Sequence, residues 1–172
     1  MKTALQNLSD YTGTVGELQN FLQQNPESFS LMFREMLHNP NARVRLRMGN
    51  AVEKAARRNP EMLKPFRMEI LAALERKETE IIWQVALLLG HLNLEEDDLA
   101  LAVNTLFNWL DTIPHKFVKI NCLQTLAVLA KQHDWLQSEV KEILQASLEH
   151  ESPAIRARAR ILLKAFNATK KR

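Results

Sequence analysis

The sequence of 172 residues is poor in several residue types that whole classes of protein depend on. Cys122 is the single cysteine, which excludes an internal disulfide framework and a zinc site built from cysteine thiolates. Glycine occurs 4 times and aromatic residues make up 6% of the chain. Because strands favour aromatic and β-branched residues, these shortages favour an all-α protein.

Long hydrophobic runs are also missing from the sequence. No stretch of about 18 uncharged apolar residues occurs, which argues against a membrane-spanning helix. The first ten residues carry one lysine and no apolar segment of signal-peptide length. We therefore expect a soluble, cytoplasmic protein that does not act at a membrane. The length allows one domain or a short repeat array with a sizeable core.

The sequence contains no recognisable catalytic or metal-binding motif. It has neither a glycine-rich phosphate loop nor a Gly-x-Ser-x-Gly elbow, and the acidic run at 95–98 fits a helix start better than a calcium loop. The histidines are scattered, have no His or Cys partner four residues on, and are expected as dipole partners at helix C-termini: His38, His91, His115, His133, His150. We expect Cys122 to pack in the core, and we expect no catalytic residue, cofactor or metal.

Charge, by contrast, is present and unevenly distributed. The net charge is +3, but residues 43–77 carry +6, residues 78–115 carry −7 and residues 151–172 carry +6. An acidic middle is thus flanked by two basic segments. Such an asymmetry bears on partners and on association rates rather than on the fold.

Residues 42–58, ARVRLRMGNAVEKAARR, begin with alternating basic and apolar residues, as a half-buried strand would. Over the whole stretch, however, apolar residues recur every three or four positions, which predicts an amphipathic helix. The helix should end before Asn59-Pro60, because a residue that precedes proline avoids the α region. Its apolar face consists of Val44, Met48, Ala51, Val52, Ala55. Its basic and polar face consists of Arg43, Arg47, Asn50, Lys54, Arg57, Arg58.

Other segments give the same helical pattern. Thr14 and Glu17 form a predicted capping box, and Pro26 stands at a helix-start position. Short connections of three to five residues favour antiparallel helical hairpins. Further helices are expected at 14–25, 26–37, 60–74, 81–94, 95–110, 135–150 and 152–166.

A repeat emerges when the second helix of each hairpin is aligned. The aligned branched apolar residues are 38, 36 and 37 positions apart: Val44, Ile82, Val118, Ile155. Four positions later stand mostly small residues: Met48, Ala86, Cys122, Ala159. A period near 37 predicts stacked helical hairpins that share a core, and these eight positions should be almost fully buried.

A turn followed by Val-Arg-x-x-Ala on the second helix resembles the HEAT repeat. The stretches VRLRM and IRARA match best, VKINC matches less closely, and IWQVA carries Trp83 in place of the arginine. The resemblance covers roughly residues 26–168, and the chain is similar to small bacterial HEAT-repeat proteins without an assigned activity. It implies a right-handed α-solenoid of the armadillo type. It also implies that Arg45 and Arg156 contact an acidic residue of a neighbouring repeat.

The expected organisation is a single repeat domain over residues 1–172, of about four hairpins. Residues 1–25 form an N-terminal helical cap and residues 169–172 a basic tail. The predicted repeats cover about 26–59, 60–94, 95–133 and 134–168.

The basic face of helix 42–58 is the main functional feature of the sequence. This face is either solvated or a row of cations that binds an anionic partner. The second interpretation rests on the repulsion between clustered like charges, which a nearby anion relieves. Arg45 lies off this row and should find an acidic or carbonyl partner. The candidate residues for binding an anionic partner are Arg43, Arg47, Lys54, Arg57, Arg58, Arg160, Lys164.

Two binding functions fit these observations. The first is a non-enzymatic scaffold or adaptor that binds another protein through a solenoid surface. The second is binding of the nucleic-acid phosphate backbone through the basic helix and the C-terminal helix. Some HEAT-like proteins are alkylpurine DNA glycosylases, which need an aromatic-lined cleft with a catalytic carboxylate, and the sequence offers no such pair. The oligomeric state is left open.

Overall fold

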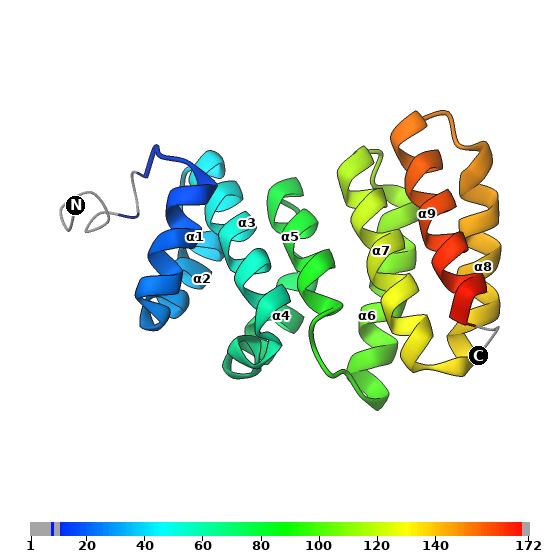
Figure 1. Ribbon diagram of the computed structural model, residues 1–172, viewed down its shortest axis with the longest axis horizontal. Helices are drawn as coiled ribbons and strands as arrows, with labels where there is room; N and C mark the ends of the chain where they lie inside the picture. The colour runs from blue at the N-terminus through cyan, green and yellow to red at the C-terminus, as the bar shows by residue number, and fades with distance from the viewer. Residues whose placement is uncertain (1–7, 9–10, 170–172) are drawn as a thin grey trace. The chain divides into compact units, whose positions relative to one another are not determined.

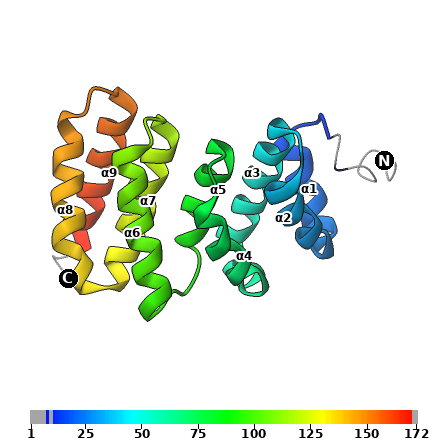
Figure 2. The same cartoon turned by 180° about the vertical axis from the view of Figure 1, so that it is seen from behind.

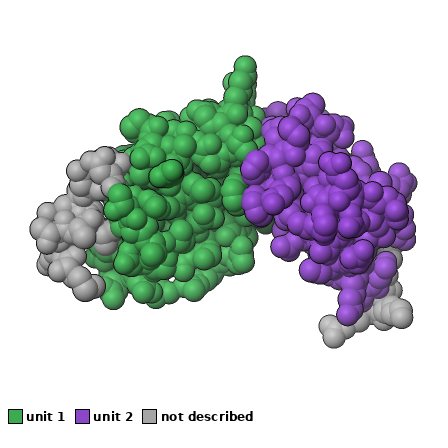
Figure 3. Space-filling view, turned by 90° about the horizontal axis from the view of Figure 1, so that it is seen from above, with its two compact units in different colours: residues 1–93 green, residues 94–172 purple. Residues whose placement is uncertain are grey.

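The protein folds into helices throughout the part that the structure describes. The computed structural model describes residue 8 and residues 11–169, and no strand occurs among them. None of these helices is both long and apolar enough to cross a membrane. The chain divides into two compact units, residues 1–93 and residues 94–172, which Figure 3 shows in separate colours.

The first unit consists of an N-terminal helix followed by two hairpins. Its α-helices are α1 (Val15–Gln24), α2 (Phe29–His38), α3 (Ala42–Arg58), α4 (Arg67–Ala72) and α5 (Thr79–Leu89). Short 3₁₀ segments precede or extend them: η2 (Pro26–Ser28), η3 (Pro60–Phe66) and η4 (Ala73–Glu75). Helix α3 is central in this unit, since it contacts α1, α2 and α5 (Figure 1).

The second unit consists of two hairpins. Its α-helices are α6 (Glu96–Thr112), α7 (Lys116–Gln132), α8 (Gln137–Ala146) and α9 (Pro153–Thr169), with η5 (Asp134–Leu136) and η6 (Ser147–Glu149) at the two ends of α8. Helices α6 and α7 lie side by side as one hairpin, and α8 and α9 as the other (Figures 1 and 2). Helix α7 packs against α9.

The helix ends follow the local signals of the sequence. Thr14 and Glu17 form the predicted capping box, with each side chain bound to the backbone N–H of the other residue. Asn41 caps α3 by accepting the N–H of Arg43. Helix α3 ends at Arg58, directly before Asn59-Pro60, as predicted.

The continuous helix predicted over residues 60–74 is wrong. This segment forms η3 over Pro60–Phe66, then the short helix α4, then η4 over Ala73–Glu75. Pro65 lies inside η3. Because proline has no N–H and its ring crowds the preceding turn, it prevents a regular α-helix here.

The four second helices repeat with a constant step. Helices α3, α5, α7 and α9 begin at Ala42, Thr79, Lys116 and Pro153, which are 37 residues apart each time. In each helix the backbone N–H of the fourth residue donates to the carbonyl of the residue just before the helix. These pairs are Arg45 to Asn41, Ile82 to Glu78, Lys119 to His115, Arg156 to Ser152. The residue equivalent to Val44 is therefore Ile81 rather than Ile82. Both isoleucines are buried, so their pattern alone could not fix the register.

The core consists of the apolar faces that the repeat predicts. All eight marked positions are buried, with at most 4% of their surface exposed: Val44, Met48, Ile82, Ala86, Val118, Cys122, Ile155, Ala159. On α3, Ala51 and Val52 are also buried, whereas Ala55 is half-buried. The predicted burial is thus confirmed, and each unit has a core of this kind.

Candidate anion-binding site

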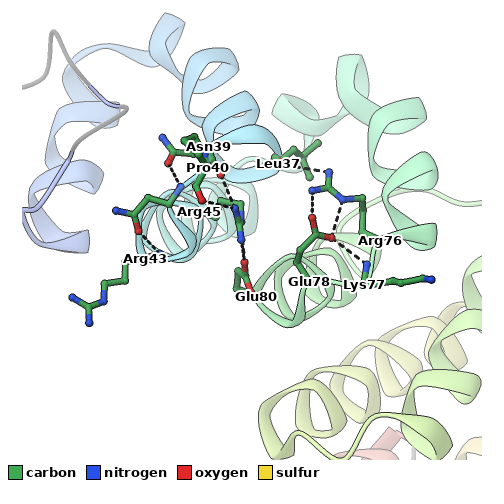
Figure 4. Close-up of polar contacts among 10 residues, drawn as sticks. Leu37, Asn39, Pro40, Arg43, Arg45, Arg76, Lys77, Glu78 and Glu80 are labelled. Atoms are coloured by element: carbon green, nitrogen blue, oxygen red, sulfur yellow. Dashed lines mark hydrogen bonds and ion pairs between the residues drawn. The ribbon is translucent and has the colours of Figure 1, made fainter.

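Arg45 serves to hold the first unit together. Its Nε lies 2.8 Å from Oε1 of Glu80 on α5, and its Nη1 donates to the carbonyl of Asn39 at 2.7 Å (Figure 4). Only 14% of the arginine side chain and 19% of the glutamate side chain are exposed. The expectation that Arg45 finds acidic and carbonyl partners is confirmed. An ion pair of this kind joins consecutive hairpins of the unit.

Basic residues at the same position of α7 and α9 bind carbonyl groups in the last turn of the preceding helix or in the connection after it. Lys119 Nζ donates to the carbonyl of Leu110, and Arg156 Nη1 donates to the carbonyls of His150 and Glu151 at 2.7 and 2.8 Å. Arg156 thus binds backbone rather than the acidic side chain that the HEAT resemblance implies. Each of these cations satisfies carbonyls left free where a first helix ends.

In the second hairpin the equivalent position is occupied by Ile82, and Arg76 supplies the guanidinium instead. Arg76 Nη1 donates to the carbonyl of Leu37 at 3.1 Å, and its Nε and Nη2 donate to the carboxylate of Glu78 at 3.0 and 2.5 Å (Figure 4). These hydrogen bonds from Arg76 lower the pKa of Glu78 to about 2.

Two members of the predicted basic row are already engaged within the first unit. Arg47 is half-buried and donates to the carbonyl of Tyr11 at 3.0 Å, so the expectation of an exposed Arg47 is wrong. The segment before α1 passes close to this face of α3, which the helical pattern of α3 alone does not reveal. Arg57 is exposed but forms a bidentate pair with Glu53, at 2.8 and 2.9 Å.

Glu53 is a buried acid of α3 that binds a second basic group besides Arg57. Its carboxylate also binds His91, with Nε2 of the imidazole 3.1 Å from Oε1. Burial by itself would raise the pKa of Glu53, but the hydrogen bonds from His91 and Arg57 outweigh it and lower the pKa. A Glu four residues before Arg57 on a basic helix is the signal that could have identified this pair.

The histidines do not all lie where they were expected. His38 ends α2 and His133 follows α7, as expected of C-terminal dipole partners. His115 instead precedes α7 at its N-terminus, so the expectation is wrong there. His150 follows η6, and its Nδ1 accepts the N–H of Ser152 at 3.0 Å.

The remaining candidate cations are exposed, and their side chains have no hydrogen-bond or ion-pair partner within the described part of the chain. On α3 these are Arg43, Lys54 and Arg58, and on α9 they are Arg160 and Lys164. Figure 4 shows the Arg43 side chain pointing away from the Arg45 cluster. The predicted row of α3 is therefore reduced to one isolated cation and one pair.

Lys54 and Arg58 line a groove of about 220 Å³ in the first unit. The two residues are one turn apart on α3, so their side chains share a face. Gln19 of α1 lies in the same lining, and its Nε2 is buried without a hydrogen-bond partner. The complete lining is Gln19, Leu22, Gln23, Pro26, Lys54, Ala55, Arg58, Asn59, Met62.

This groove can hold an anion beside an apolar group. Lys54, Arg58 and the Gln19 amide nitrogen are hydrogen-bond donors without acceptors, which favours a carboxylate or phosphate oxygen. Leu22 and Met62 supply an apolar wall beside them.

Elsewhere, burial raises the pKa of Cys122 to about 12, so its sulfur is a protonated thiol at neutral pH, as a packing role requires. Among the described residues, no group of three or more His, Cys, Asp or Glu is placed to hold a metal ion.

Comparison of the chain with protein-family models, with curated proteins and with solved structures finds no match.

Proposed function

We propose that the protein is a non-enzymatic binding module of HEAT-like hairpins, and that its first unit binds an acidic segment of another protein. The observation that carries this proposal is the groove between α1 and α3. Its polar lining brings two unpaired cations together with an amide nitrogen that lacks an acceptor. A repeat step of 37 residues supports the solenoid architecture, in which neighbouring hairpins share a continuous core.

A protein segment fits the groove better than a nucleic-acid backbone does. A phosphate backbone is best met by a continuous row of cations, and the engagement of Arg47 and Arg57 interrupts the row on α3. Arg43 lies eleven residues from Lys54, about 16 Å along the helix axis at 1.5 Å per residue. An acidic side chain followed by an apolar one matches the donors and the apolar wall of the groove.

The test is a double charge reversal, Lys54→Glu with Arg58→Glu, compared with the single reversal Arg43→Glu. The probe is an array of ten-residue peptides that combine Glu or Asp with Leu or Met, and the readout is fluorescence anisotropy with selected peptides. Both variants should unfold within about 0.5 kcal/mol of the parent chain, because all three side chains are exposed. Only the double variant should lose peptide binding, by tenfold or more.

Equal loss of binding in the Arg43→Glu variant would contradict a localised groove and indicate general attraction to a basic surface. The nucleic-acid alternative is tested with a 20-base-pair duplex over a range of salt concentrations. Binding to the duplex that exceeds peptide binding and falls steeply with salt would overturn the proposal in favour of a phosphate-backbone binder.

A further inference from the structure

The second unit contains a cavity whose lining includes carboxylates, whereas the charged residues that line the groove of the first unit are cations. It has a volume of about 300 Å³ and lies where the ends of α6 and η6 approach α7 and α9. Leu110, Leu123, Ile143 and Ile155 supply apolar walls. The polar lining includes Asp111, Lys119, Ser147, Glu149 and His150.

The two carboxylates of this cavity are exposed to solvent and unpaired within the described residues, whereas Lys119 and Ser147 are bound to backbone carbonyls. Asp111 and Glu149 are exposed and have no hydrogen-bond or ion-pair partner among residue 8 and residues 11–169. Lys119 donates to the carbonyl of Leu110, and the Ser147 hydroxyl donates to the carbonyl of Ile143 at 2.7 Å. The lining contains two carboxylates and one lysine, which leaves an excess of negative charge.

The repeat identifies the corresponding place in the first unit. Two steps of 37 residues relate Leu37 to Asp111 and Arg76 to His150. In the first unit Arg76 extends across the corner between its two hairpins and donates to the carbonyl of Leu37 (Figure 4). A guanidinium of the chain itself thus occupies the equivalent corner, where Glu78 balances its charge.

The second unit differs from this arrangement at both ends of the contact. His150 replaces Arg76, and its shorter imidazole is turned to the N–H of Ser152. Asp111 replaces Leu37, whose backbone carbonyl accepts the guanidinium in the first unit, so a carboxylate side chain lies at this helix end in the second unit. Ser152 replaces Glu78 by the same two steps, so the corner of the second unit lacks the guanidinium together with its carboxylate partner, while Asp111 adds a carboxylate side chain.

We propose that this cavity binds the side chain of an arginine from a partner protein. The guanidinium would bind Asp111 and Glu149, and its aliphatic stem would lie along Leu123, Ile143 and Ile155. Guanidinium–carboxylate hydrogen bonds are short and directional, and arginine is less strongly hydrated than lysine, so arginine is favoured over lysine. Apolar contacts with the stem add to the binding, since long charged side chains bury their methylene groups against apolar surface.

The proposal is tested by titrating the full chain with Nα-acetyl-arginine-N-methylamide and recording amide chemical shifts by NMR. We expect shifts confined to residues that line the cavity, and a dissociation constant on the order of 1 mM for a ligand of this size. The matching citrulline derivative, which has the same shape without the charge, should not bind. The lysine derivative should bind several-fold more weakly.

Two variants distinguish the cavity from general charge attraction. Asp111→Asn with Glu149→Gln should weaken binding of the arginine probe by about tenfold or more. Glu142→Gln removes an exposed carboxylate of α8 outside the lining and should leave the affinity unchanged. Far-UV circular dichroism and thermal unfolding check that each variant keeps the fold.

His150→Arg provides an independent test because it restores an internal guanidinium at the position equivalent to Arg76. The variant should retain or raise the melting temperature and should no longer bind the arginine probe. Unchanged binding in His150→Arg or in the double variant would overturn the proposal. Equal binding of the citrulline derivative, tighter binding of the lysine derivative, or shifts located away from the cavity would overturn it as well.

Discussion

Single basic residues at one position of the second helix bind backbone carbonyls near the end of the first helix of the same hairpin. Arg45 links α3 to Glu80 on α5 and also satisfies the carbonyl of Asn39. Lys119 binds a carbonyl in the last turn of α6 and Arg156 binds carbonyls that follow η6, both without a carboxylate partner among the described residues. A basic residue at this position thus binds carbonyls near the end of a first helix in three hairpins. Within the described part of the chain, only Arg45 also forms an ion pair with the next hairpin.

The Arg45→Ala substitution tests this structural role. It leaves Glu80 and the carbonyl of Asn39 without their donor in a largely buried place, so we expect a loss of about 1–3 kcal/mol in the free energy of unfolding. Urea denaturation measures the change. Arg43→Ala, on the exposed face of the same helix, is the matched control and should change stability by less than about 0.5 kcal/mol. Equal stability of the two variants would contradict the role assigned to Arg45.

At the scale of the helix, the α3–α5 contact depends on the absence of a side chain at Gly49. A Cβ atom added there would lie 2.3 Å from Cγ and 2.7 Å from Cδ of Gln84. Gln84 is fully buried on α5, and its Nε2 lies 3.3 Å from Oδ1 of Asn50. Gly49 therefore allows a close approach of two helices, although glycine in a helix interior costs about 1 kcal/mol relative to alanine.

We expect Gly49→Ala to destabilise the protein despite its higher helix propensity. Overpacking of this kind costs about 1–3 kcal/mol, which exceeds the gain from propensity. Combining it with Gln84→Ala should recover much of that loss, because the clashing side chain is then removed. Gly16→Ala on α1 is the control, since its Cβ would lie 3.8 Å from the nearest atom, Thr14 Oγ1. Thermal unfolding of the three variants tests the prediction, and a stabilising Gly49→Ala would contradict it.

For the whole molecule, the sequence predicts the helices and the buried positions well because both follow from periodicity. The eight marked core positions are buried, and α3 ends where Asn59-Pro60 requires. Tertiary contacts were harder to predict. The binding of Arg47 to the Tyr11 carbonyl and the pairing of Glu53 with His91 join residues 36 and 38 positions apart. No short-range pattern encodes such contacts, so the free cations could not be separated from the engaged ones.

The division into two compact units predicts that a defect in one core should be felt mainly within its own unit. Val118→Asp places a charge at a position with no exposed surface in α7, which should cost several kcal/mol. Hydrogen exchange should then accelerate in α6 to α9 more than in α1 to α3, because each unit has its own core. Lys131→Asp, at an exposed position of the same helix, is the control and should leave exchange nearly unchanged. Equal acceleration in α3 and α7 would show instead that the hairpins unfold as one cooperative array.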